Sequence, residues 1–217
     1  MSTPDSFIEE VTEEVRRDRL FAVFRRYGWI AILAVVAVVA GAAWNEWQKA
    51  RAQSSAEIFG DAVLAAIDLP DPAARLAALS GLAATGDQAA VLGFLTASEA
   101  VKADDRAAAL TKYQTLADDA SLPKSYRDMA ALKRVILIGA DQPIAGRAAV
   151  LQPLSAAGQP FRALALEQLA LLKLEAGEIE AAVTQLRALL QEPNLTAGLQ
   201  RRASGLMVAL GADPEAQ

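Results

Sequence analysis

The chain has 217 residues, contains no cysteine and no histidine, and carries 21 basic and 26 acidic side chains, for a net charge of −5. The absent residue types exclude disulfides, zinc sites of the Cys/His type, and the Ser-His-Asp and Cys-His arrangements of nucleophilic catalysis. No cationic stripe is present for a phosphate backbone, so nucleic acid is not an expected partner.

Residues 1–26 predict a short amphipathic helix. Phe7, Ile8, Val11 and Val15 recur at helical spacing, and glutamates cover the opposite surface. Such a cytoplasmic leader would either contact a partner or rest on the inner leaflet through its Arg and Phe side chains.

Residues 27–47 predict a transmembrane helix. From Tyr27 to Trp44 the chain runs for 18 residues without a charge. An 18-residue helix spans about 27 Å, close to the roughly 30 Å hydrocarbon core of a bilayer. Aromatic side chains stand at both ends, where they favour the headgroup level: Tyr27, Trp29, Trp44 and Trp47.

The flanking charges predict the orientation of this span. Only Lys49 and Arg51 follow it closely, whereas five arginines precede it, at positions 16, 17, 19, 25 and 26. Because basic residues mark the cytoplasmic side, the N-terminus is expected inside, and the C-terminal part in the periplasm beyond the inner membrane.

Two other features of the span bear on its role. A cleavable signal peptide is the alternative to an anchor, since Ala40-Gly41-Ala42 fits a cleavage site, but the 26 preceding residues include six acids, unlike a short basic leader. Ala37 and Gly41 form a small-x-x-x-small pair that could bring two copies together as a homo-oligomer. In so Ala-rich a helix, such a pair arises readily by chance.

Residues 48–70 predict a stalk helix, because no proline occurs between Pro4 and Pro70. Beyond it the periodicity is helical throughout, so the fold class expected is all-α. Helices of roughly 13 to 17 residues are separated by regular breaks, and helix pairs recur with a period near 36 residues. The breaks lie around Gly86, Asp104, Pro123, Gly139, Gly158, Gly177 and Pro193.

The segment from Leu164 to Pro193 resembles the tetratricopeptide consensus in its order of small and large positions. Residues 71–194 therefore predict a tetratricopeptide-like solenoid of helical hairpins, and residues 195–217 a capping helix with a tail. The repeat register predicts these packing positions: Ala109, Tyr113, Ala130, Ala170, Gly177, Ala182 and Leu186.

Solenoids of this kind bind partners on the concave face that their first helices form. Apolar anchors beside arginines would suit an extended peptide or a partner's helix. The alternatives are burial of Leu171 and Leu174 against the capping helix, and surface pairing of the two arginines with Asp128 or Asp141. The register places these residues in the groove: Phe94, Val101, Lys102, Arg127, Arg134, Glu167, Leu171 and Leu174.

Two acidic doublets, Asp104-Asp105 and Asp118-Asp119, are the candidate catalytic or metal-binding carboxylates. Both fall at helix breaks, where aspartate commonly caps a helix or solvates a turn, and we favour that interpretation. The sequence also lacks a glycine-rich phosphate loop, a GxSxG elbow and an HExxH motif. No catalytic residue, metal or cofactor is therefore expected, and the chain is not expected to be an enzyme.

The arrangement as a whole resembles the ancillary Sec translocon subunit family of bacterial inner membranes. The leader DSFIEEVTEEVRRDRLFAVFRRYGWIA and the segment SYRDMAALKRVIL look like its alphaproteobacterial variants. The resemblance implies an adaptor beside the protein-conducting channel, with the translocon, a periplasmic chaperone and exported chains as partners. The alternatives are a scaffold for outer-membrane assembly or envelope signalling, and a helical enzyme or ligand-binding module.

Overall fold

The computed structural model describes the backbone of residues 4–214, and the side chains of that range except 4–24, 27 and 31. The amphipathic face predicted for the leader therefore lies outside the described side chains. The chain divides into two compact units, Met1–Gly60 and Asp61–Gln217. Over the described residues the secondary structure is entirely helical, which confirms the all-α expectation.

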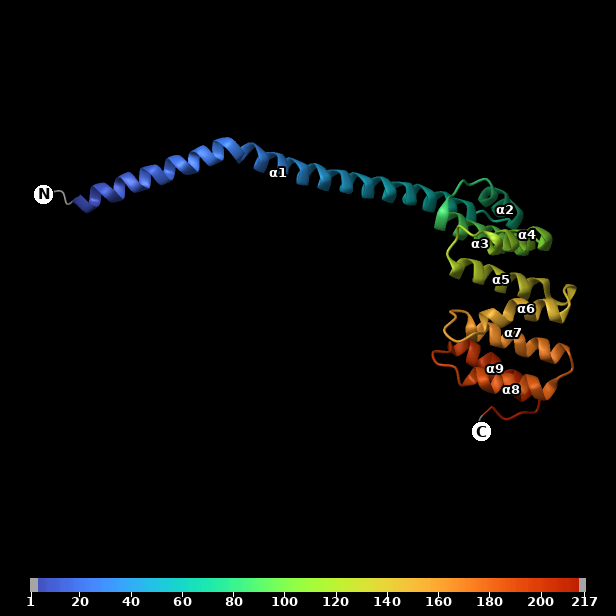
Figure 1. Cartoon of the computed structure of the whole chain (residues 1–217). Coiled ribbons are helices and arrows are strands. Elements are labelled where there is room, and N and C mark those ends of the chain that lie inside the picture. The colour runs from blue at the N-terminus through green and yellow to red at the C-terminus, as the bar shows by residue number, and fades with distance from the viewer. Residues whose placement is uncertain (1–3, 215–217) are drawn as a thin grey trace. The chain divides into compact units, whose positions relative to one another are not determined.

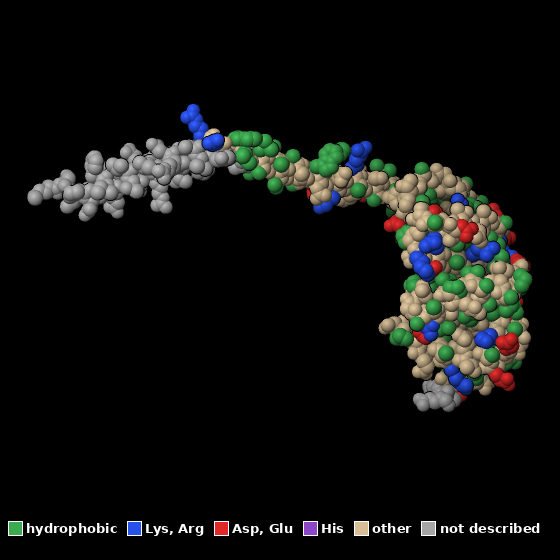
Figure 2. Space-filling model, viewed as in Figure 1, with side chains coloured by type: hydrophobic (Ala, Val, Ile, Leu, Met, Phe, Trp, Pro, Cys, Tyr) green, Lys and Arg blue, Asp and Glu red, His purple; other side chains and the backbone are tan. Residues whose placement is uncertain are grey.

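Helix α1 is continuous from Pro4 to Ile67 and supplies nearly all of the first unit (Figure 1). It ends before the Leu69-Pro70-Asp71-Pro72 segment, because each proline removes a backbone donor and clashes with a continuing helix. Between Gly28 and Ile67, α1 is long and apolar enough to cross a membrane, with a mean hydropathy of 1.9 over its best 18 residues. None of that window is buried, and hydrophobic side chains gather along it (Figure 2).

The second unit contains eight α-helices within the described residues, joined by short connections that fall at the predicted breaks. A single turn of 3₁₀-helix, Gly139–Asp141, follows α5. The α-helices are α2 (Pro72–Ser80), α3 (Gly86–Lys102), α4 (Arg106–Asp118), α5 (Lys124–Ile138), α6 (Ile144–Leu154), α7 (Arg162–Glu175), α8 (Ile179–Leu190) and α9 (Ala197–Ala209).

Local chemistry explains where these helices begin and end. The Asp71 and Asp105 carboxylates accept backbone hydrogen bonds at 2.9 Å and cap α2 and α4. Asp119 accepts hydrogen bonds from the backbone and hydroxyl of Ser121 in the turn after α4, and these lower the pKa of its carboxyl. The capping and turn roles expected for Asp105 and Asp119 are thus confirmed. Gly177 takes φ of 79° after α7, a left-handed conformation that suits glycine.

Each helix of the second unit packs mainly on its neighbours in sequence, from α2 through α9. In Figure 1 these helices follow one another from α2 to the α8–α9 pair. Successive helices share core clusters, so the apolar core runs along the stack. One cluster joins α5, α6 and α7, and another joins α7, α8 and α9.

Small residues set the closeness of neighbouring helices. At Gly93 of α3, an added Cβ would lie 2.9 Å from Leu116 Cδ2 of α4, closer than real Cβ contacts. The hairpin of α7 and α8 uses fully buried alanines, Ala170 and Ala182. Because Ala170 and Ala182 are fully buried, a larger side chain at either position would overpack the hairpin.

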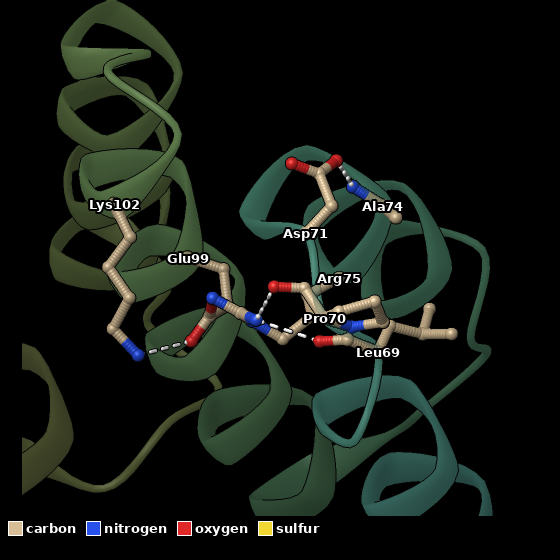
Figure 3. Close-up of polar contacts among 7 residues, drawn as sticks. All are labelled: Leu69, Pro70, Asp71, Ala74, Arg75, Glu99 and Lys102. Atoms are coloured by element: carbon tan, nitrogen blue, oxygen red, sulfur yellow. Dashed lines mark hydrogen bonds and ion pairs between the residues drawn. The ribbon is translucent and has the colours of Figure 1, made fainter.

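Arg75 ties the turn after α1 to α3 (Figure 3). Its Nε donates to Glu99 Oε2 at 2.6 Å, and its guanidinium also donates to the carbonyls of Leu69 at 2.7 Å and Pro70 at 3.1 Å. Lys102 Nζ donates to Glu99 Oε1 at 2.5 Å, so both oxygens of this buried carboxylate are engaged. The hydrogen bonds from Lys102 and then Arg75 hold the pKa of Glu99 below its usual value.

Candidate partner-binding groove

An apolar groove of about 630 Å³ lies between α5, α7 and α9. Large aliphatic side chains on its walls remain exposed: Ile136 of α5 by 51%, Leu171 of α7 by 39% and Leu164 of α7 by 37%. Leu206 of α9 completes the apolar surface, and the fully buried Leu186 of α8 lies at its base. These residues form a connected apolar surface, the usual character of a binding site.

The sequence of α7 explains why one stripe of this helix stays open. Leu166 and Ala170 pack into the cluster with α8 and α9, and Ala165 and Leu172 pack into the cluster with α5 and α6. Packing on these two sides leaves a third stripe, with Leu164 and Leu171 seven residues apart on one side of the helix. Helix α7 thus carries more apolar surface than its neighbours cover.

A charged pair borders the groove. Arg202 of α9 donates to both carboxylate oxygens of Glu167 of α7, through Nε at 2.7 Å and Nη2 at 3.0 Å. Glu167 is buried, whereas more than half of the Arg202 side chain is exposed. This two-point contact holds α9 against α7 beside the apolar surface and leaves much of the Arg202 side chain exposed at the rim.

The structure brings only two of the residues predicted for the groove together, Glu167 and Leu171. Leu174 is half-buried and does not line the groove. Phe94 instead packs in the core of α3, α4 and α5, with ring centroids 6.2 Å from Tyr113 and 6.4 Å from Tyr126. The last two residues predicted on α3 lie at its C-terminal end, with Val101 exposed and Lys102 bonded to Glu99.

The two predicted arginines of α5 are half-buried and do not line this groove. Arg127 and Ile136 are nine residues apart, about two and a half helical turns, so they lie on opposite sides of α5. Neither arginine forms the suggested ion pair with Asp128 or Asp141. Asp128 pairs with Lys124, and Asp141 pairs with Arg106.

Several groove residues were not anticipated from the sequence. Ile136 belongs to the run Val135-Ile136-Leu137-Ile138, and four consecutive apolar residues exceed what one buried helix face uses, which was a usable signal. The sequence gave less indication that residues of α9 would line the groove, because a capping helix is expected to present a polar outer surface. The unanticipated lining residues are Ile136, Leu164, Gln168, Leu186, Arg202, Ala203, Gly205, Leu206 and Ala209.

The residues predicted for repeat packing lie in the interior, apart from the glycine at the α7–α8 turn. Tyr113 is buried, and burial raises the pKa of its hydroxyl. Gly177 occupies the turn between α7 and α8. The remaining five are fully buried: Ala109, Ala130, Ala170, Ala182 and Leu186.

The groove combines an apolar lining with one charged pair that is already satisfied internally. Among the described residues, no group of three or more acidic, cysteine or histidine side chains is placed to hold a metal ion. Comparison of the chain with protein-family models, curated proteins and solved structures gave no match.

Proposed function

We propose that this protein is a single-pass inner-membrane adaptor whose periplasmic helices bind partner proteins through the α5–α7–α9 groove. The observation that supports this proposal is the groove itself. Its exposed Ile136, Leu164 and Leu171 form one uncovered apolar surface among the described residues. The resemblance to the ancillary Sec translocon subunit family supports a proposed place for this adaptor in the cell. The adaptor serves beside the Sec translocon, and its partners are a periplasmic chaperone and exported chains.

The membrane anchor in this proposal is the apolar part of α1. Its exposed aliphatic side chains, such as Ile32 and Val38, favour lipid over water. The upstream arginines set the orientation, with the N-terminus in the cytoplasm and the second unit in the periplasm.

The second unit is proposed to be a tetratricopeptide-like solenoid. Packing between sequence neighbours and the buried Ala170 and Ala182 of the α7–α8 hairpin support this assignment. In such a stack, α5 and α7 are first helices of consecutive pairs and α9 is the cap. The groove is then lined by two first helices and the cap.

The dimensions of the groove indicate its ligand. Leu164 and Leu171 are two helical turns apart, about 10 Å, which matches the apolar side of a two-turn helix or three residues of an extended peptide. The exposed Arg202 side chain at the rim is placed to donate hydrogen bonds to a carboxylate of the partner. We therefore expect a partner segment with two or three apolar anchors and a flanking acid.

Photocrosslinking in cells tests this proposal. A photoreactive residue at position 171 should trap translocon or chaperone proteins. The same residue at position 179, an exposed apolar position of α8 outside the groove lining, should not. Equal capture from both positions would contradict the groove, and capture of only outer-membrane assembly or signalling proteins would contradict the Sec setting.

Filling the groove provides a second test. Nothing lies within 4 Å of a Cβ added at Gly205, so Gly205→Leu should enter the groove without disturbing α9. We expect this variant to abolish crosslinking from position 171, and the matched Gly205→Ala, which adds one methyl, to retain most of it. Undiminished crosslinking in Gly205→Leu would place the partner elsewhere.

A further inference from the structure

A second surface lies in the first unit, where the apolar run of α1 ends. Trp44 and Trp47 are 61% and 52% exposed, and their ring centroids are 5.3 Å apart. The Arg51 guanidinium carbon lies 5.3 Å from the Trp47 ring centroid, a cation–π contact. Arg51 is thus held against an aromatic ring at the boundary of the apolar segment.

The direction of the Arg51 side chain is significant. Side chains of a helix lean toward its N-terminus, so the guanidinium of Arg51 is carried back one turn, to the level of Trp47. Trp47 lies three residues, about 4.5 Å, beyond Trp44, which ends the uncharged run. The headgroup layer on each side of a bilayer is roughly 5–7 Å thick. The guanidinium therefore stands at headgroup depth when the uncharged run fills the hydrocarbon core.

The surface around Arg51 is suited to an anion. A shallow hollow there is lined by Trp47, Ala50, Arg51, Ser54, Ser55 and Ile58. This lining contains a cation, two hydroxyl donors and no carboxylate. The neighbouring charges lie elsewhere around the helix, since Lys49 is about 160°, Glu46 about 140° and Glu57 about 120° from Arg51.

We infer that this Trp47–Arg51 surface binds the headgroup of an anionic phospholipid in the leaflet that α1 reaches after Trp44. The guanidinium donates hydrogen bonds to the phosphate, and the Trp47 ring covers the glycerol region. This inference rests on the proposed membrane span. It goes beyond that span by assigning the preferred lipid and the residue that selects it.

Lipid quenching of tryptophan fluorescence tests the inference. The full chain carrying Trp29→Phe, which leaves Trp44 and Trp47, is reconstituted in vesicles containing phosphatidylglycerol and phosphatidylcholine, with one or the other brominated on its acyl chains. Competition between them reports the lipid beside the two tryptophans. We expect phosphatidylglycerol to be preferred about fivefold, the effect of one basic side chain at an anionic surface.

Two substitutions of equal charge identify the selecting residue. Arg51→Gln should bring the preference close to one, whereas Lys49→Gln, on the opposite side of α1, should leave it unchanged. An equal loss in both variants, or no preference in the parent chain, would overturn the lipid site while leaving the anchor intact. Quenching that depends on protein density would identify a second copy as the occupant and would also overturn it.

One further result would also count against the membrane anchor. If neither brominated lipid quenches the tryptophans, this part of α1 is not in contact with lipid, and both the anchor and the site are wrong.

Discussion

Several arginine side chains of the second unit donate hydrogen bonds to backbone carbonyls in the connections between helices. Arg106 donates to the Leu137 and Ile138 carbonyls at the end of α5, and Arg147 donates to the Gln142 carbonyl before α6. Each also pairs with a carboxylate, as Arg147 does with Glu175, and this hydrogen bond lowers the pKa of Glu175. Partly exposed ion pairs of this kind contribute little to the free energy of unfolding, so their main effect is to fix the local geometry of the chain.

Glu99 differs from these carboxylates because it is buried, and it gives a pH prediction. Its pKa is lowered in the folded chain, so the stabilisation is complete above the unfolded value of about 4.3 and is lost as pH falls through the folded value. Glu99→Gln should lower the free energy of unfolding by about 1–3 kcal/mol at pH 7, since charged hydrogen bonds to Arg75 and Lys102 are lost.

The pH dependence separates this effect from a general packing defect. Denaturant unfolding of the detergent-solubilised chain, followed by circular dichroism, should show the difference between parent and Glu99→Gln narrowing from pH 6 to pH 3. The exposed Glu180→Gln should match the parent at both pH values. A difference that stays constant with pH would mean that the Glu99 charge does not contribute as described.

At the scale of the helix pair, α7 and α8 depend on small residues at their contact. Ala182 of α8 is fully buried, so Ala182→Phe should overpack the hairpin and lower the free energy of unfolding by about 1–3 kcal/mol. Thr184→Phe on the exposed side of α8 adds a ring without overpacking and should change stability by less than about 0.5 kcal/mol. Equal unfolding midpoints for the two variants in urea would contradict the close contact.

Helix limits were largely predictable, whereas the groove was not. Asp71, Asp105 and Gly177 act on backbone groups within a few residues, so their effect can be recognised in the sequence alone. The exposure of Ile136 and the partial burial of Phe94 depend on neighbouring helices that are distant in sequence. A repeat register transferred from one unit to the next therefore placed Phe94 on an open face, whereas the structure packs it, partly buried, among α3, α4 and α5.

At the scale of the whole molecule, the charges around the apolar run lead to a topology prediction. Replacing the arginines at positions 16, 17, 19, 25 and 26 with glutamine should invert a substantial fraction of the chains, because the charges that set the proposed orientation are removed. A C-terminal alkaline phosphatase fusion, active only in the periplasm, measures this as lost activity. Removing the downstream Lys49 and Arg51 charges should not reduce activity, and full activity after loss of all five arginines would refute the charge argument.

The amino-acid sequence by itself determined the helical class, the breaks between helices and the apolar segment long enough to cross a bilayer. Each of these depends on local composition, spacing or backbone chemistry within a few turns of helix. Only the tertiary structure decided that Ile136, Leu164, Leu171 and Leu206 share one groove, and that Arg202 holds Glu167 beside it. An apolar side chain looks the same in sequence whether a neighbouring helix covers it or leaves it open, and that choice is made only when α5, α7 and α9 pack.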